Sequence, residues 1–417
     1  MTRLPAAGLL LIIFATTPAT AQFSGFMSAG YGYNSNPLYN YEELSDQLRQ
    51  SYLELGYVHQ MPSARLQAVY VGGLTLFNRF EGRNYYEHSV AGQYLATLST
   101  IPARDDEEEY TGDNPFSSPD SSDTELGIDL RLGARHDKTE YEVFDNFGAG
   151  LGGFVRWAPG AAVRTRVLLQ TGLRNYNNLD VLSNITTELH GELTTRPGRF
   201  TAGVRAGGGF KHYTEELVDT SLYADPSGTT KTPGKGKGGA KVQPPGGSKN
   251  LLANAQTTTT WQIVGGVHAA SAWNGGTAMA QALYRHNPGS PDRYLTQYAS
   301  TTMLTEDIYN DHYSWSGPEF RLRVTQALPL GLRAVSNGEY LDKTFGFPAL
   351  SLLGEPVAAE RNDNRFGIDI YLSRFIPVGG SVGLDVALGA EYVSNASNDE
   401  YNDYSTSSVT LSLGVGF

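Results

Sequence analysis

The chain has 417 residues, a net charge of −12, 48 glycines, 25 tyrosines and no cysteine. The lack of cysteine excludes disulfides, thiolate metal sites, a cysteine nucleophile and covalently attached haem. The acidic balance argues against nucleic acid as a partner. Abundant glycine and tyrosine suit packed strands with an aromatic rim, although a soluble β-sandwich of this length would share that composition.

Residues 1–22 have the pattern of a secretory signal peptide. Arg3 gives the positive start, residues 9–15 form a short apolar core, and Ala19-Thr20-Ala21 makes a cleavage site of small residues. The apolar core is too short to cross a bilayer as a helix. We therefore expect the mature chain, residues 23–417, to leave the cytoplasm.

Segments of about ten residues in which apolar and polar positions alternate follow through the mature chain. Strands are predicted at 23–33, 52–59, 66–77, 85–98, 126–134, a segment ending at Trp157, 163–174, 185–194, 200–210, 258–269, 277–284, 320–327, 332–340, 366–376, 382–392 and 409–417. The predicted number of strands is about 16, with a margin of two. With the N-terminus in the periplasm, the short Pro/Gly turns fall on the periplasmic side and the long polar connections outside. Residues 101–124 are the exception, a long periplasmic connection unless the count is wrong nearby.

Two connections have a biased composition. Residues 101–124 contain the acidic run at 105–109, which we interpret as a solvated loop, with a divalent-cation site or a docking tail for a basic partner as alternatives. Residues 213–255 are rich in Lys, Gly and Pro and cannot build a core. We expect an extracellular surface loop there, with contact to lipopolysaccharide phosphates as the alternative.

The last strand alternates without exception. Its apolar positions are Val409, Leu411, Leu413, Val415 and Phe417. Such a strand would pair with other chains if its edge and face were left in water. It resembles the C-terminal membrane-insertion signal of Gram-negative outer-membrane β-barrel proteins, which ends on Phe. With the signal peptide and the strand pattern, the resemblance covers 23–417 and is porin-like, without a match to a particular porin family. It implies an all-β, transmembrane antiparallel barrel of about 16 strands.

The same alternation assigns most strand charges to the face opposite the apolar residues. The predicted lumen and selectivity residues are Arg131, Arg135, Arg156, Arg164, Arg166, Arg174, Glu188, Glu192, Arg205, Arg321, Arg323, Asp385 and Glu391. A charge facing lipid near the midplane would cost about 2–4 kcal/mol, so this one-sided pattern favours a membrane barrel over a sandwich. Basic rings in a pore favour anions. Alternatively, the charges pair across strands and fill the barrel.

No constellation of catalytic residues stands out. The eight histidines are scattered, and neither a G-x-S-x-G nor an H-E-x-x-H pattern is present. Glu188, His190 and Glu192 share one strand face, which we interpret as a lumen charge network rather than a metal site. Trp261 and Trp315 are predicted as aromatic rim residues. We expect no catalytic residue, metal or cofactor, and no enzyme activity.

The sequence predicts a porin-like channel in the outer membrane of a Gram-negative bacterium, through which small polar solutes diffuse along an Arg-lined lumen. One alternative is a barrel scaffold that holds a periplasmic or surface protein, such as the sleeve of a cytochrome conduit. Another is a receptor or adhesin acting through its loops. The expected partners are outer-membrane lipid, lipopolysaccharide and the barrel-assembly machinery, and no nucleic acid.

Overall fold

The computed structural model describes residues 21–37, 39, 41–98, 124–138, 142–160, 163–178, 180–195, 199–214, 259–288, 312–352, 356–400 and 402–417. Nearly all of the predicted signal peptide (1–22), acidic connection (101–124) and Lys/Gly/Pro-rich loop (213–255) lies outside these residues. In the described ranges, no helix is long and apolar enough to cross a membrane.

The described residues form sixteen strands joined in several places by one-turn 3-10 helices. The strands are β1 (Ala21–Asn34), β2 (Asp46–Met61), β3 (Ala64–Phe77), β4 (Tyr85–Thr97), β5 (Glu125–Asp137), β6 (Asn146–Gly160), β7 (Val163–Tyr176), β8 (Asn184–Thr195), β9 (Phe200–Tyr213), β10 (Thr259–Trp273), β11 (Gly276–His286), β12 (Trp315–Leu328), β13 (Leu332–Leu350), β14 (Pro356–Gly379), β15 (Val382–Ser397) and β16 (Tyr404–Gly416). The 3-10 helices are η1 (Glu81–Arg83), η2 (Glu142–Phe144), η3 (Asp180–Leu182), η5 (His312–Ser314) and η6 (Pro329–Gly331).

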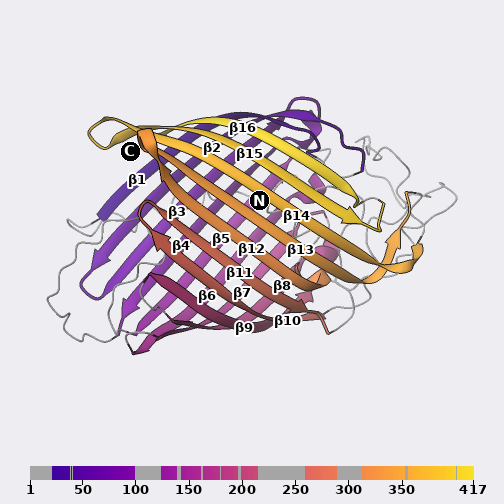
Figure 1. The fold of residues 1–417 in the computed structure, drawn as a ribbon, viewed down its shortest axis with the longest axis horizontal. Helices are drawn as coiled ribbons and strands as arrows, with labels where there is room; N and C mark the ends of the chain where they lie inside the picture. The colour runs from indigo at the N-terminus through magenta and orange to yellow at the C-terminus, as the bar shows by residue number, and fades with distance from the viewer. Residues whose placement is uncertain are drawn as a thin grey trace, which may run out of the picture.

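The strands close into one antiparallel barrel. Each strand pairs with the next along the chain, and β1 also pairs with β16, with Met27 opposite Val415. Figure 1 shows the strands running obliquely around this wall. Closure leaves no open sheet edge, which solves the pairing problem posed by the terminal strand. The prediction of an antiparallel barrel of about 16 strands is confirmed.

No strand lies between β4 and β5 in the barrel. β4 and β5 pair directly, from Thr97 opposite Glu125 to Tyr85 opposite Asp137. The connection between them therefore starts and ends at the same rim as the chain termini. That rim also carries the tight turns between β2 and β3, β10 and β11, and β14 and β15.

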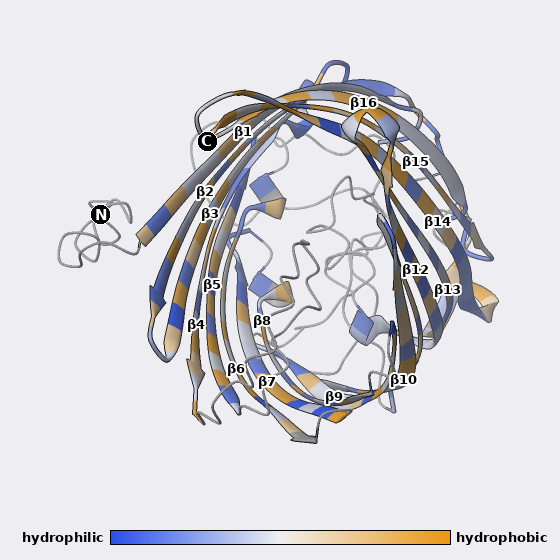
Figure 2. Cartoon of the chain, turned by 60° about the vertical axis from the view of Figure 1, so that its left-hand side comes forward, coloured by the Kyte–Doolittle hydropathy of each residue, from blue (hydrophilic) through white to orange (hydrophobic). Residues whose placement is uncertain are grey.

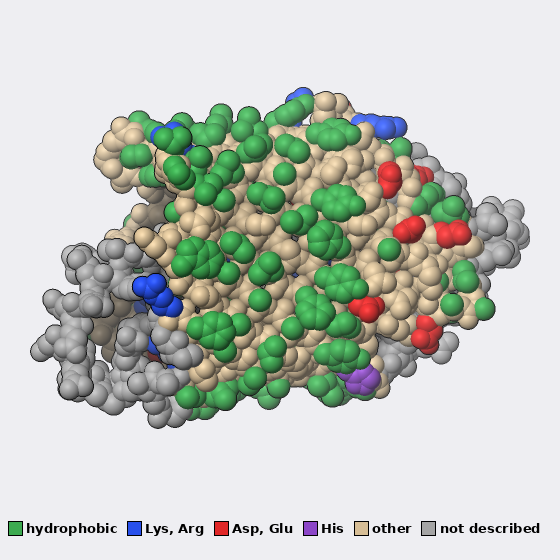
Figure 3. All heavy atoms as spheres, viewed as in Figure 1, with side chains coloured by type: hydrophobic (Ala, Val, Ile, Leu, Met, Phe, Trp, Pro, Cys, Tyr) green, Lys and Arg blue, Asp and Glu red, His purple; other side chains and the backbone are tan. Residues whose placement is uncertain are grey.

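The outer surface of the wall is apolar. On β5, Ile128, Leu130 and Leu132 are 55, 50 and 40% exposed, and Asp129 and Arg131 alternate with them toward the opposite face. Figure 3 shows hydrophobic side chains over the middle of one side of the barrel, with charged side chains gathered toward its ends. Figure 2 shows the same alternation of apolar and polar positions along the strands. This belt makes the wall a transmembrane surface, because charges in it would cost several kcal/mol.

At the rim away from the termini, several strands run further than predicted. β13 continues to Leu350 and β14 begins at Pro356, about ten residues beyond the predicted limits. The added residues include Lys343, Arg361 and Asp363, which are at most 2% exposed. Outward positions such as Asp342 and Asn362 are polar here as well, so the apolar alternation stops before the strands do.

One predicted rim residue lies elsewhere. Trp261 is 54% exposed, as a rim residue should be, but Trp315 is 4% exposed and packs with Leu341 and Phe345. Trp315 is paired in register with Phe345 and shares its face. The prediction for Trp315 was wrong, because the unpredicted first residues of β12 carry it into an interior apolar cluster.

The end of the chain is fastened to the first strand. The backbone N–H of Gly25 donates to the carbonyl oxygen of Phe417 (2.8 Å), and the N–H of Phe417 donates to the carbonyl of Gly25 (2.9 Å). The Phe417 ring lies over Gly25, where a Cβ would be 2.3 Å from its Cζ. A larger residue at position 25 would have to displace the ring, so glycine here suits the packing of the terminal aromatic side chain.

We expect Phe417→Ala to lower the amount of folded barrel in the membrane several-fold, because the closing strand loses the ring that covers Gly25. The measurement is heat-modifiable mobility of the protein on SDS gels of membrane fractions. Phe200→Ala is the matched control, since Phe200 is also exposed at the same rim but lies on β9, away from the closing pair. Equal losses in both variants would contradict a special role for the terminal residue.

Candidate functional site

The strand register shows which side chains share the inner face of the wall, because directly opposed residues point the same way. One such row crosses β5 to β9 through Glu125, Arg156, Arg166, Glu192 and Arg205. It alternates acidic and basic groups except at its centre, where two arginines are neighbours.

All predicted lumen residues lie on this inner face, opposite the apolar belt. They are Arg131 and Arg135 on β5, Arg156 on β6, Arg164, Arg166 and Arg174 on β7, Glu188 and Glu192 on β8, Arg205 on β9, Arg321 and Arg323 on β12, and Asp385 and Glu391 on β15.

Toward the rim away from the termini, inward charges are paired and buried. Arg135 Nη2 is 2.7 Å from Asp137 Oδ1, and its guanidinium carbon lies 4.0 Å from the centroid of the Tyr85 ring. Arg285 Nε donates to Glu319 Oε2 (2.8 Å). Pairing of this kind compensates the buried charges locally. Arg285 and Glu319 pair across neighbouring strands, whereas Arg135 and Asp137 pair within β5.

Other inward arginines have no such partner. Within the ranges that the structure describes, Arg131, Arg166, Arg205 and Arg323 form no ion pair. The four lie on β5, β7, β9 and β12, so positive charge is distributed around much of the inner wall. Unpaired guanidinium groups on a polar wall attract anions.

Glu188 on the inner face has four side-chain hydrogen-bond partners. Its carboxylate contacts His190 Nε2 (3.0 Å) and His312 Nε2 (2.9 Å), and accepts from Tyr313 Oη (3.0 Å) and Gln170 Nε2 (2.8 Å). His312 and Tyr313 belong to η5, in the connection between β11 and β12. Through these contacts Glu188 holds η5 against the wall strand β8.

The histidine cluster predicted from one strand face is rearranged. His190 contacts Glu188, but Glu192 instead has His268 of β10 as its partner, with Nε2 3.4 Å from Oε1. Among the described residues, no three His, Asp or Glu side chains are placed to hold a metal ion together. The partner of Glu192 could not be predicted from the sequence, because it depends on the register of β9 between β8 and β10.

We expect Glu188→Gln to lower the free energy of unfolding by about 1–3 kcal/mol, because the amide presents a donor to groups that now donate to a carboxylate. Urea unfolding of the barrel in detergent measures the change. Tyr313→Phe removes one of those donors, so the two substitutions should be coupled by about 0.5 kcal/mol or more in a double-mutant cycle. Strict additivity would show that Glu188 does not hold η5.

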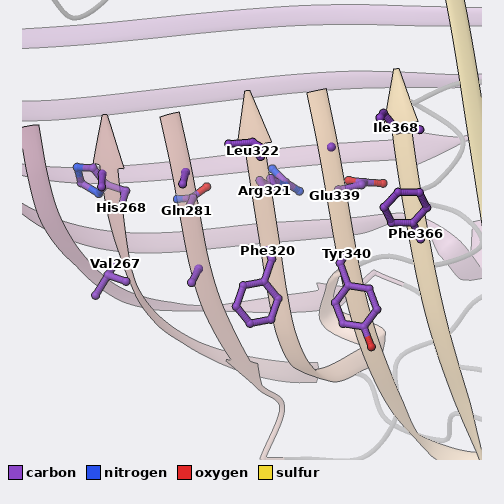
Figure 4. Close-up of a pocket in the computed structure, with 14 residues that line it drawn as sticks. Val267, His268, Gln281, Phe320, Arg321, Leu322, Glu339, Tyr340, Phe366 and Ile368 are labelled. Carbon is purple, nitrogen blue, oxygen red and sulfur yellow. The ribbon is translucent and has the colours of Figure 1, made fainter. Parts of the chain in front are cut away.

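One hollow lies on the apolar outer face of the wall. It measures about 630 Å³ and is bordered by Val267, Phe320, Leu322, Phe366 and Ile368, with alanines of β11 between them. Figure 4 shows this stretch of β10 to β14 with the inward residues His268, Arg321 and Glu339 on the same strands. A smaller hollow of about 100 Å³ lies against Glu188 and Arg205 on the inner side.

No protein-family model matches the chain, and no curated protein matches it. Among solved structures, it is similar to the outer membrane protein OpdK from Pseudomonas aeruginosa, with a TM-score of 0.44 and 10% identity over 95% of this chain and 99% of that one. OccK9 (OpdG) from the same organism has a TM-score of 0.45 and 10% identity over 95% and 98%. CdiB from Acinetobacter baumannii has a TM-score of 0.43 and 8% identity over 94% of this chain and 60% of that chain.

The closed barrel and its apolar belt place the chain in the outer membrane of a Gram-negative bacterium. Each strand is hydrogen-bonded to a neighbour on both sides, and the outward residues suit lipid. The predicted location is confirmed by these features of the molecule itself.

Proposed function

We propose that the protein is a porin-like channel through which small polar solutes diffuse passively, with anions favoured over cations. The observation that carries this proposal is the set of unpaired inward arginines, Arg131, Arg166, Arg205 and Arg323, within a closed barrel whose outer face is apolar. A cation held on a polar wall lowers the energy of a passing anion and raises that of a cation. The protein acts without catalysis in this proposal.

The terminal strand supports a second part of the proposal, which concerns assembly. The outward residues Val409, Leu411, Leu413 and Phe417 are 52–59% exposed, so they are available to the barrel-assembly machinery and later to lipid. Lipopolysaccharide is the expected neighbour at the rim away from the termini.

Single-channel conductance of the purified, refolded barrel in a planar bilayer tests the function. A salt gradient across the bilayer gives the ion selectivity from the reversal potential. We expect a steady conductance with anion preference. A stably folded but silent barrel would contradict the channel and favour the scaffold alternative, which a pull-down of a periplasmic or surface partner would then test.

A further inference from the structure

Two arginines of the inner wall share one aromatic ring. Arg156 on β6 and Arg166 on β7 are directly opposed in the register. Their guanidinium carbons lie 5.5 and 4.5 Å from the centroid of the Phe154 ring. Like charges directly opposed on neighbouring strands repel each other. The shared contact with the negative face of the ring offsets part of that repulsion.

Arg156 and Arg166 differ in whether a carboxylate is paired with them. Arg156 Nη1 donates to Glu125 Oε2 at 2.6 Å. Across the described residues, no carboxylate lies within 4 Å of the Arg166 guanidinium, and its Nε is buried without a hydrogen-bond partner. Glu192 is opposite Arg166 in the register, but its Oε1 is engaged by other groups, His268 and Thr194. Glu192 and Asp129 attract Arg166 electrostatically, but neither is paired with it. The Arg166 guanidinium is therefore left without a direct carboxylate partner.

The Phe154 ring beneath the two arginines is buried and packed against the neighbouring strand. Phe154 is 4% exposed and lies against Gly127 of β5, where a Cβ would be 2.1 Å from the ring atom Cε1. The buried ring fills the space that a side chain at position 127 would take. Both guanidinium groups are thus placed before any solute arrives, which lowers the ordering cost of binding.

We propose that Phe154 holds Arg156 and Arg166 as a binding site for solutes that carry a single carboxylate. This inference rests on the proposed channel function and names its substrate class. The planar fork of Arg166 matches the two oxygens of a carboxylate. The row of Glu125, Arg156, Arg166, Glu192 and Arg205 carries one net positive charge, which one carboxylate neutralises. A dianionic phosphate would place excess negative charge beside Glu125 and Glu192.

Gluconate inhibition of the KCl current through single channels tests this site, with sorbitol as the uncharged control of matched size and inorganic phosphate as the dianionic probe. For the wild type we expect half-inhibition at a much lower concentration of gluconate than of sorbitol or phosphate. Arg166→Lys keeps the charge but loses the fork, and Phe154→Leu keeps the apolar volume but loses the ring face. Each should raise the half-inhibiting gluconate concentration about tenfold, the effect of one charge-assisted hydrogen bond.

The variants separate a positioning role of Phe154 from simple packing. If Phe154→Leu lowers barrel stability but leaves gluconate inhibition unchanged, the proposed role of the ring is wrong. If phosphate inhibits as strongly as gluconate with the same dependence on Arg166, the single-carboxylate class is wrong. A normal KCl current without selective gluconate inhibition would overturn the site and leave the channel intact. A barrel without current would overturn both proposals.

Discussion

The double variant Arg164→Glu/Arg166→Glu should convert the channel from anion-selective to cation-selective. Both residues lie on the inner face of β7. Arg166 is beside Arg156 and opposite Glu192, and Arg164 is opposite Thr194. Two positive charges become two negative charges, a change of four charge units within one segment of the wall. At ε of about 20, one charge at 4 Å contributes about 4 kcal/mol, so a change of this size dominates the local potential.

The reversal potential in a KCl gradient measures this effect, and it should change sign. The change should be largest near 0.1 M salt, where the Debye length is about 10 Å, and shrink toward 1 M. Arg49→Glu/Arg374→Glu is the matched control, because it changes the net charge equally on the outer face, where the two residues are opposed to Tyr31 and Leu332. If the control reverses selectivity as strongly, the inner position of Arg164 and Arg166 is not the cause.

The sequence was sufficient for the architecture because a membrane barrel repeats one rule along its whole length. Every predicted strand is present, since an outward charge is costly and an inward one is not. Strand ends were predicted less well where the rule stops applying. At Lys343 and Arg361 the wall has left the apolar belt, so inward and outward positions are both polar and the alternation disappears.

The pairing of the inner charges could not be predicted in the same way. The alternation along a strand shows which face of the wall each residue lies on. The partner of a charged residue depends on the register between strands that are far apart in sequence. Glu188 meets His312 across 124 positions, and no local pattern indicates this contact. The position of Phe154 could have been predicted from the sequence. It lies two residues before Arg156 on β6, so the alternation places both side chains on the inner face.

The buried pair Arg361–Asp363 gives the largest expected effect on stability. The two side chains are 1% and 0% exposed, with Arg361 Nε 2.9 Å from Asp363 Oδ1. Asp363 also accepts from Ser397 Oγ (2.5 Å), and Arg361 lies 4.3 Å from the centroid of the Phe345 ring. Asp363→Ala leaves a buried guanidinium without its carboxylate, so we expect the free energy of unfolding to fall by about 3–5 kcal/mol.

Replacing both partners distinguishes a lost ion pair from a lost packing contact. In Arg361→Met/Asp363→Leu, no charge of the pair remains buried, so the double variant should be more stable than Asp363→Ala alone. Asp385→Ala is the control: this carboxylate faces inward on β15 but is only half-buried, and its loss should change the unfolding free energy by less than about 1 kcal/mol. Urea unfolding in detergent, followed by heat-modifiable gel mobility, measures all three. If Asp363→Ala matched the Asp385 control, the pair would be a consequence of the extended β13–β14 hairpin and not one of the interactions that hold it.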